Sequence, residues 1–146
     1  MRYVNTMREE EGGTYGAQTS TDISIEPKQE ATINISFNAK PSSADKLREI
    51  ASKEIHNLAQ EGPKAEEFEM TYNNMLKKIP EGRIHNSYWA NAIQQYELYN
   101  FDCDKEYEKA IKSLTPQAIR NIVKEILSSG NFIEVIMRPG ETGEKE

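Results

Sequence analysis

A ten-residue stretch near the start, Met7 to Gly16, gathers the residue types that first suggest chemistry. It reads MREEEGGTYG and combines an arginine, three glutamates, two adjacent glycines and a Tyr-Gly pair. The glycines do not form a phosphate loop, because G-x-x-x-x-G-K-[ST] is absent and Glu9 to Glu11 would repel a phosphate. Helix termination alone accounts for the stretch: Arg8 is a cation near a helix C-terminus, a glycine ends the helix, and Tyr15 starts a strand.

The other residues that could bind a metal or act as a nucleophile are two histidines and one cysteine. A catalytic zinc needs three protein ligands, whereas His56 lies in a predicted helix and His85 in a predicted loop. No H-x-x-E-H, H-E-x-x-H or C-x-x-C motif occurs. Cys103 stands among acidic residues, which disfavour a reactive thiolate. We therefore expect no cofactor and no catalytic zinc in this chain.

Charge and composition limit the classes of partner. The chain has 146 residues, a formal net charge of −6 and no Lys/Arg run longer than two. A nucleic acid or an anionic membrane surface would require a basic face, so neither partner is expected. No apolar run approaches the roughly 18–20 residues that span a bilayer.

Alternating polar and apolar residues predict the strands. The alternation from Thr14 to Ile25, with Tyr15 and Ala17 in the same row, is followed by a polar turn at Glu26 to Glu30 and a second alternation from Ala31 to Asn38. Two such runs joined by a short turn indicate an antiparallel hairpin. A third strand is predicted at Phe132 to Met137.

Between the hairpin and the last strand, apolar residues recur with helical spacing. Gly62-Pro63 ends the first helix, Pro80 and Gly82 break or kink the second, and Thr115 with Pro116 starts the last. The apolar stripes are Leu47, Ile50, Ala51, Ile55 and Leu58; Phe68, Tyr72, Met75, Leu76 and Ile79; Trp89, Ala92, Ile93, Tyr96 and Tyr99; Tyr107, Ala110 and Ile111; and Ile119, Ile122, Val123, Ile126 and Leu127.

These elements predict an α+β fold in which an antiparallel sheet carries helices on one face. We expect a single, partial domain over residues 1–139 and a polar tail over 140–146. Three strands are few for so many helices, and Tyr3 and Met7 stand one helical turn apart at the start. Both observations favour a piece of a longer protein whose remaining strands lie upstream.

The aromatic residues of the third helix have two interpretations. Tyr88, Trp89, Tyr96, Tyr99 and Phe101 could form a stacking platform for a single-stranded nucleic acid. Such platforms accompany basic grooves, and this chain is acidic. We therefore interpret these side chains as core.

Several segments together resemble the C-terminal half of pitrilysin/insulinase-type zinc peptidases, over roughly Arg8 to Pro139. That half carries an arginine, six residues and then Tyr-Gly at a helix-to-strand junction, which Arg8, Tyr15 and Gly16 match in this sequence. The spacing alone is a weak signal, but the order of the following segments is strong. These are ISF (Ile35 to Phe37), LREIASKEIHNLAQEGPKAEEFE (Leu47 to Glu69), NSYWANAI (Asn86 to Ile93), LTPQAI (Leu114 to Ile119) and NFIEVIMRP (Asn131 to Pro139).

The resemblance implies a zinc metalloendopeptidase that encloses peptides between two halves. An N-terminal half, on the same polypeptide or on a partner chain, would carry the zinc and H-x-x-E-H. In this chain Arg8 would bind the substrate backbone, and the Tyr15 hydroxyl would donate to the oxyanion of the tetrahedral intermediate. Because the motif is absent here, we expect this chain alone to be inactive. Bacterial members of the family are often periplasmic or envelope proteins, which the sequence itself cannot show.

Two departures or alternatives accompany the resemblance. The segment IPEGR (Ile79 to Arg83) interrupts the helix before NSYWANAI, where the family is usually continuous or joined differently. A non-catalytic scaffold of the same fold would also have this sequence pattern, and a peptide-binding module could use the hairpin edge. We expect some self-association through that edge if it is uncovered.

Overall fold

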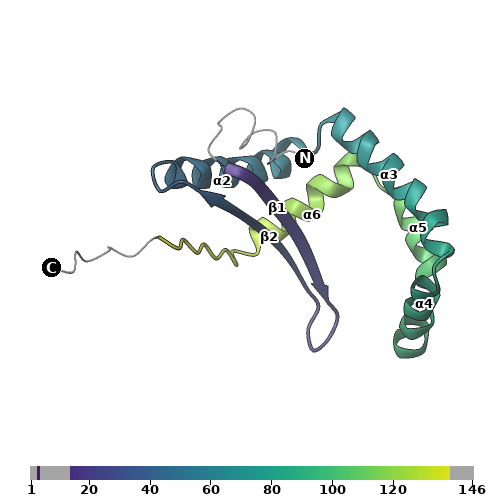
Figure 1. The fold of residues 1–146 in the computed structure, drawn as a ribbon. Coiled ribbons are helices and arrows are strands. Elements are labelled where there is room, and N and C mark those ends of the chain that lie inside the picture. The colour runs from purple at the N-terminus through teal and green to yellow at the C-terminus, as the bar shows by residue number, and fades with distance from the viewer. Residues whose placement is uncertain (1–2, 4–13, 139–146) are drawn as a thin grey trace. The chain divides into compact units, whose positions relative to one another are not determined.

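The computed structural model describes residue 3 and residues 14–138, with Tyr15 described by its backbone alone (Figure 1). The fold is α+β, as predicted. By contacts it divides into a hairpin unit, Met1–Gln60 with Val123–Glu146, and a helical unit, Glu61–Ile122. In chain order the elements are β1 (Thr14–Ser24), β2 (Glu30–Ala39), α2 (Ala44–Glu61), α3 (Ala65–Arg83), α4 (Asn86–Tyr99), α5 (Cys103–Ser113) and α6 (Pro116–Ser128).

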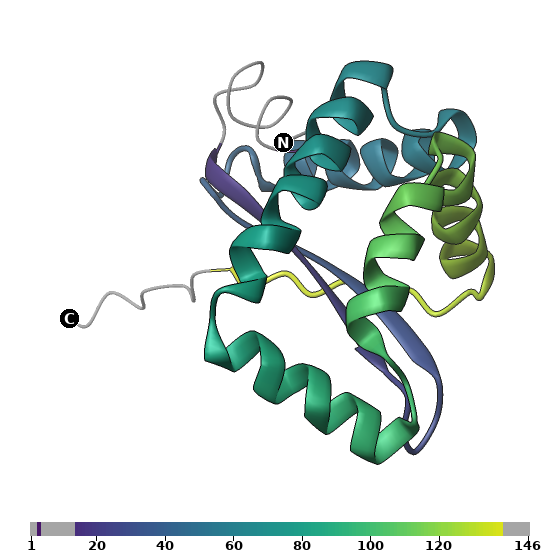
Figure 2. The same ribbon diagram turned by 90° about the vertical axis from the view of Figure 1, so that its right-hand side faces the viewer.

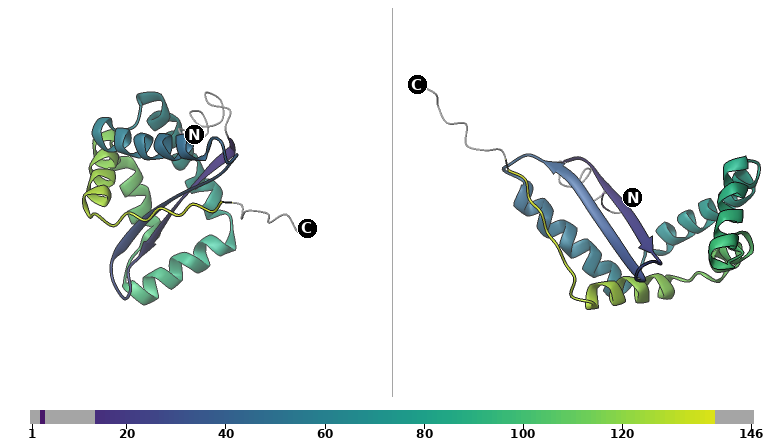
Figure 3. Two further views of the ribbon diagram at one scale, coloured as in Figure 1. Left: turned by 90° about the vertical axis from the view of Figure 1, so that its left-hand side faces the viewer. Right: turned by 90° about the horizontal axis from the view of Figure 1, so that it is seen from below.

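The hairpin unit is held together where α2 packs on the base of the hairpin. β1 and β2 form a two-stranded antiparallel sheet, and α2 runs alongside it (Figure 3). Leu47 and Ala51 of α2 are buried, together with Tyr3, whose hydroxyl donates to the Ala51 carbonyl at 3.1 Å. The hairpin residues that pack against this cluster are Ala17, Ile35, Phe37 and Ala39. The apolar stripe predicted for α2 therefore faces the sheet.

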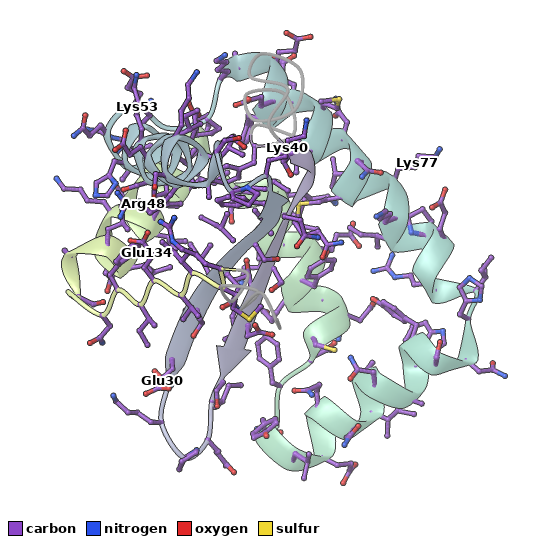
Figure 4. The ribbon with its side chains drawn as sticks, turned by 60° about the vertical axis from the view of Figure 1, so that its left-hand side comes forward. Glu30, Lys40, Arg48, Lys53, Lys77 and Glu134 are labelled. Atoms are coloured by element: carbon purple, nitrogen blue, oxygen red, sulfur yellow. The ribbon has the colours of Figure 1, made fainter. Side chains whose placement is uncertain are left out.

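The predicted strand at Phe132 to Met137 is wrong. The described chain from Asn131 to Arg138 forms no strand, because a strand requires a hydrogen-bonded neighbour and the described sheet contains only β1 and β2. Ion pairs tie the segment to α2 instead. Arg48 meets Glu134 at 3.3 Å, as Figure 4 shows, and Arg138 meets Asp45 at 2.9 Å.

The helical unit contains a second departure from the sequence prediction. Pro80 and Gly82 do not break the second helix, since α3 continues from Ala65 through both residues to Arg83. Pro80 removes one backbone N–H donor, but Ile79 beside it is buried, at 5% exposed. Burial of this neighbour offsets part of the cost of a proline inside a helix. The interruption expected at IPEGR is therefore absent.

The helix α4 lies across the ends of α3 and α5 (Figure 2). It presents Tyr88, Ala92 and Gln95 as its half-buried positions, and none of its residues is fully buried. The interpretation of its aromatic residues as core is therefore wrong for most of them. The exposed ones, α4 and its flank taken together, are Trp89 (43%), Tyr96 (52%), Tyr99 (39%) and Phe101 (48%).

The predicted helix ends are confirmed. Gly62 follows α2 with φ of 82° and Gly130 follows α6 with φ of 73°, the left-handed conformation that glycine adopts without a steric penalty. The Thr115 hydroxyl accepts from the Ala118 N–H at 3.1 Å and so caps α6. None of the helices in the described part of the chain has the length and apolar character of a membrane span.

Candidate functional site

The predicted site falls where β1 begins, and the strand is irregular at that point. Regular pairing runs from Ala17 opposite Phe37 to Ser24 opposite Glu30. Continued by two residues, this register would place Tyr15 opposite Ala39, but Thr14 is the residue found there. Tyr15 and Gly16 thus stand against Asn38 alone. Two residues against one define a β-bulge.

The bulge changes which residue occupies the core side of the strand. Ala17, Phe37 and Ala39 pack against the buried cluster of the hairpin unit. In an unbroken ladder Tyr15 would join their row, as the alternation of the sequence predicted. Thr14 takes that place instead and is 8% exposed. The prediction that Tyr15 shares a row with Ala17 is therefore wrong, because one extra residue shifts the phase of the strand.

The Thr14 hydroxyl connects the parts of the bulge. It donates to the Asn38 carbonyl at 2.5 Å and accepts from the Gly16 N–H at 3.2 Å, and the Gly16 carbonyl lies 3.0 Å away. A threonine that bonds the N–H two residues later forms a local turn of its own. The backbone before and after Tyr15 is thereby linked to one oxygen atom.

Gly16 leaves space beside the bulge. Its φ is not in the left-handed region, and a Cβ atom built on it would meet nothing within 4 Å. The chain's own described atoms therefore do not require glycine here. A glycine also allows another backbone to approach closely, which is a function a bound peptide could use.

The surface around the bulge is uncharged over the neighbouring strand residues. No Asp, Glu, Lys or Arg occurs in residues 14–21 of β1 or in residues 31–39 of β2. The polar groups available there are backbone amides, hydroxyls and side-chain amides. Such groups suit the backbone of a peptide better than a charged small molecule.

The two predicted site residues differ in what the structure describes. Tyr15 belongs to β1 at the bulge, and only its backbone is described. Arg8 lies outside the described residues. Their roles in binding substrate therefore stay predictions. The sequence analysis overlooked Thr14 and Asn38, although a glycine inside an alternating run is itself a sign of a bulge.

The candidate metal ligands are dispersed. His56 is exposed on α2, with its Nδ1 2.7 Å from the Ser52 carbonyl, and His85 precedes the first residue of α4. Cys103 is the half-buried first residue of α5. In the part of the chain that the structure describes, no three His, Cys, Asp or Glu side chains form a metal-binding group.

The helical unit contains a separate ionic cluster centred on Arg83. Its guanidinium donates to both oxygens of Asp104, at 2.8 and 3.1 Å, and to Glu108 at 2.7 Å. The Tyr88 hydroxyl also donates to Asp104. The contacts join α3, α4 and α5, so the cluster is structural. Sequence spacing could not reveal it, because its members come from three helices.

The hydrogen bonds of this cluster shift the pKa values of its members. Arg83 lowers the pKa of the Asp104 carboxyl, chiefly through its hydrogen bond. The Glu108 pKa is lowered first by Lys112 and then by Arg83. Asp104 in turn raises the pKa of Tyr88, because a donated hydrogen bond stabilises the neutral phenol.

A surface hollow beside the cluster contains three lysines of α5, but each is already paired. Lys105 meets Asp102 at 3.0 Å, Lys109 meets Glu106 at 3.4 Å and Lys112 meets Glu108 at 2.7 Å. The positive charges are thus balanced by neighbouring carboxylates. The hollow, lined also by Arg83 and Ser113, has no excess charge with which to attract an anion.

Comparison with known proteins gives a family and a structural likeness. Residues 2–75 match the family described as the peptidase M16 inactive domain. The fold is similar to that of the periplasmic protease PqqL from Escherichia coli, with a TM-score of 0.70 and 18% sequence identity. The similarity covers 87% of this chain and 14% of PqqL, so the chain corresponds to a small part of that protein. No curated protein matches the sequence.

Proposed function

Since the chain belongs to the family of the peptidase M16 inactive domain, we propose that it serves as the substrate-contacting, C-terminal-type domain of a zinc metallopeptidase. The family resemblance drawn from Arg8, Tyr15 and the later segments is confirmed. Substrate contact, the peptidase chamber and the zinc-bearing half remain parts of the proposal. Peptides are the proposed substrates.

The observation that carries the proposal is the bulge at Tyr15. β-Bulges concentrate next to active sites, where they redirect a side chain that a regular strand would bury. Thr14 occupies the core position that Tyr15 would otherwise take. Arg8 and Tyr15 both fall within the matched residues 2–75. A tyrosine removed from the core in this way is available for contact outside the sheet.

In the proposed reaction, this chain supplies hydrogen-bond donors to the substrate. Arg8 binds a backbone carbonyl of the peptide, and the Tyr15 hydroxyl donates to the oxygen that becomes negative when the scissile carbonyl is attacked. A single donor of this kind accounts for roughly 10²–10³ in rate. The space beside Gly16 admits the peptide backbone.

A separate N-terminal half supplies the zinc and H-x-x-E-H in this proposal. The described residues of this chain offer no ligand set for the metal. Zinc bound there would activate the attacking water. The half lies on the same polypeptide or on a partner chain. PqqL is a periplasmic protein, and we place the parent of this chain in the same compartment as part of the proposal.

The substitution Tyr15→Phe in the complete peptidase tests the proposal. It should lower kcat by about 10²–10³-fold with little change in thermal stability, because only the donor is removed. Tyr107→Phe is a matched control, since Tyr107 is exposed on α5, at 47%. Unchanged turnover in the Tyr15 variant would refute the oxyanion role.

A non-catalytic scaffold is the second candidate. The family description as an inactive domain and the lack of a metal-binding group among the described residues favour it. A scaffold parent would neither bind zinc in a fixed ratio nor cleave unstructured peptides. Metal analysis of the purified parent and digestion of an unfolded, labelled peptide distinguish the two candidates.

A further inference from the structure

We propose that Thr14 is a positioning residue for the peptidase reaction, and that its hydroxyl keeps Tyr15 in its working position by holding the bulge closed. The inference rests on the proposed function. It assigns a role to a residue that contacts neither substrate nor metal and that acts through its neighbour.

The burial of Thr14 is the first observation. Among the residues whose side chains are described, Thr14 is the polar one that is buried, at 8% exposed. A buried hydroxyl costs free energy unless it is hydrogen-bonded. Alanine, valine or isoleucine would fill a core position without this requirement. The threonine is explained if its hydroxyl is needed where it lies.

The bonding of the hydroxyl is the second observation. The bulge has three members after Thr14, which are Tyr15, Gly16 and the opposing Asn38. The hydroxyl oxygen accepts from the Gly16 N–H at 3.2 Å and donates to the Asn38 carbonyl at 2.5 Å. It thus connects the residue after Tyr15 with the residue opposite Tyr15.

The packing of the strand explains why this connection matters. Ala17 and Phe37 are packed against the buried cluster, so the register beyond the bulge is set by the core. The register before the bulge depends on which residue faces Ala39. If Thr14 were to give up this place, the regular ladder would put Tyr15 there, and a one-residue slip changes the face of a strand residue. The hydroxyl opposes that slip.

The test is a double-mutant cycle in the complete peptidase. Thr14→Val keeps the side-chain shape and removes the hydroxyl, Thr14→Ser restores it, and Tyr15→Phe removes the proposed donor. Thr14→Val should lower kcat by up to about 10²-fold with KM little changed, since a misplaced catalytic group has an effect of this size. Thr14→Ser should retain activity. Thr19→Val is the control, because Thr19 lies in the regular part of the same strand.

The cycle separates positioning from general stability. If Thr14 acts through Tyr15, Thr14→Val has no further effect on kcat once Tyr15 is phenylalanine. An equal loss in both backgrounds overturns the inference, and so does full activity of Thr14→Val. If Tyr15→Phe itself leaves kcat unchanged, the proposed function fails instead.

A measurement on the chain itself does not depend on activity. Amide hydrogen exchange of Gly16 should be slow in the wild type and in Thr14→Ser, and at least tenfold faster in Thr14→Val, since the acceptor is lost. The exchange of Thr19 should stay unchanged. Equal protection of Gly16 in all three chains overturns the inference. Thr14→Ala replaces Thr14→Val in both experiments if the valine variant does not fold.

Discussion

Leu47 of α2 is the most deeply buried apolar side chain among the described residues, at 1% exposed. Its neighbours in the buried cluster are Ala51 and Tyr3, with Ala17 and Phe37 of the hairpin packed against the same cluster. Truncating Leu47 to alanine should therefore weaken the packing of α2 on the strands that carry the bulge. The change removes three carbon atoms from a site with no access to water.

The expected loss follows from the buried carbons. Removing three of them costs about 2.4 kcal/mol at roughly 0.8 kcal/mol for each buried methylene. The space left behind adds to this loss, and measured Leu→Ala changes in cores reach about 5 kcal/mol. We expect a decrease of about 3–5 kcal/mol in the free energy of unfolding. With a urea slope of about 2 kcal/mol per molar, the midpoint should fall by roughly 1.5–2.5 M.

Urea unfolding followed by far-ultraviolet circular dichroism measures this decrease. Ile23→Ala is a matched control in the same unit, because isoleucine and leucine are isomers and Ile23 is 76% exposed. Its effect should stay under about 1 kcal/mol. The reasoning is refuted if the two variants lose the same stability, since burial would then not decide the cost.

Two further predictions concern the helical unit and α6. The lowered pKa values of Asp104 and Glu108 mean that their contribution to stability is complete above the ordinary carboxyl range and disappears as the pH falls through the lower folded values. Thermal unfolding between pH 7 and pH 2 should therefore show a steep loss below about pH 4 that Asp104→Asn reduces; an unchanged pH profile in that variant would contradict the assignment. Thr115→Ala removes the cap of α6 and should cost about 1 kcal/mol, measured by urea unfolding, whereas the exposed Ser113→Ala just before it should have a smaller effect.

The local features of this protein follow from short stretches of sequence. Alternation over Ala17 to Ile23 and over Ala31 to Phe37 predicts the hairpin, because a strand places every second residue on one face. Gly62 and Gly130 end helices because a positive φ is open to glycine. Each of these outcomes depends on neighbours within about one turn or one strand. The α+β class and the family resemblance rest on the order of such segments.

The outcomes that the sequence did not reveal depend on groups far apart in the chain. Pro80 stays inside α3 although proline disfavours a helix interior, since tertiary packing can exceed a local preference. The ion pairs of Arg83 join helices that are separated by about twenty residues, and no local pattern encodes that meeting.

The bulge at Tyr15 shows most directly how the two levels divide. The residues Thr14, Tyr15 and Gly16 stand in the sequence as a plain continuation of the alternating run. The core under Ala17 and Phe37 sets the phase of the rest of the strand, and the buried Thr14 hydroxyl takes the place opposite Ala39. Local sequence thus supplies the tyrosine, but packing against α2 and the opposite strand decides which side of the extra residue it occupies.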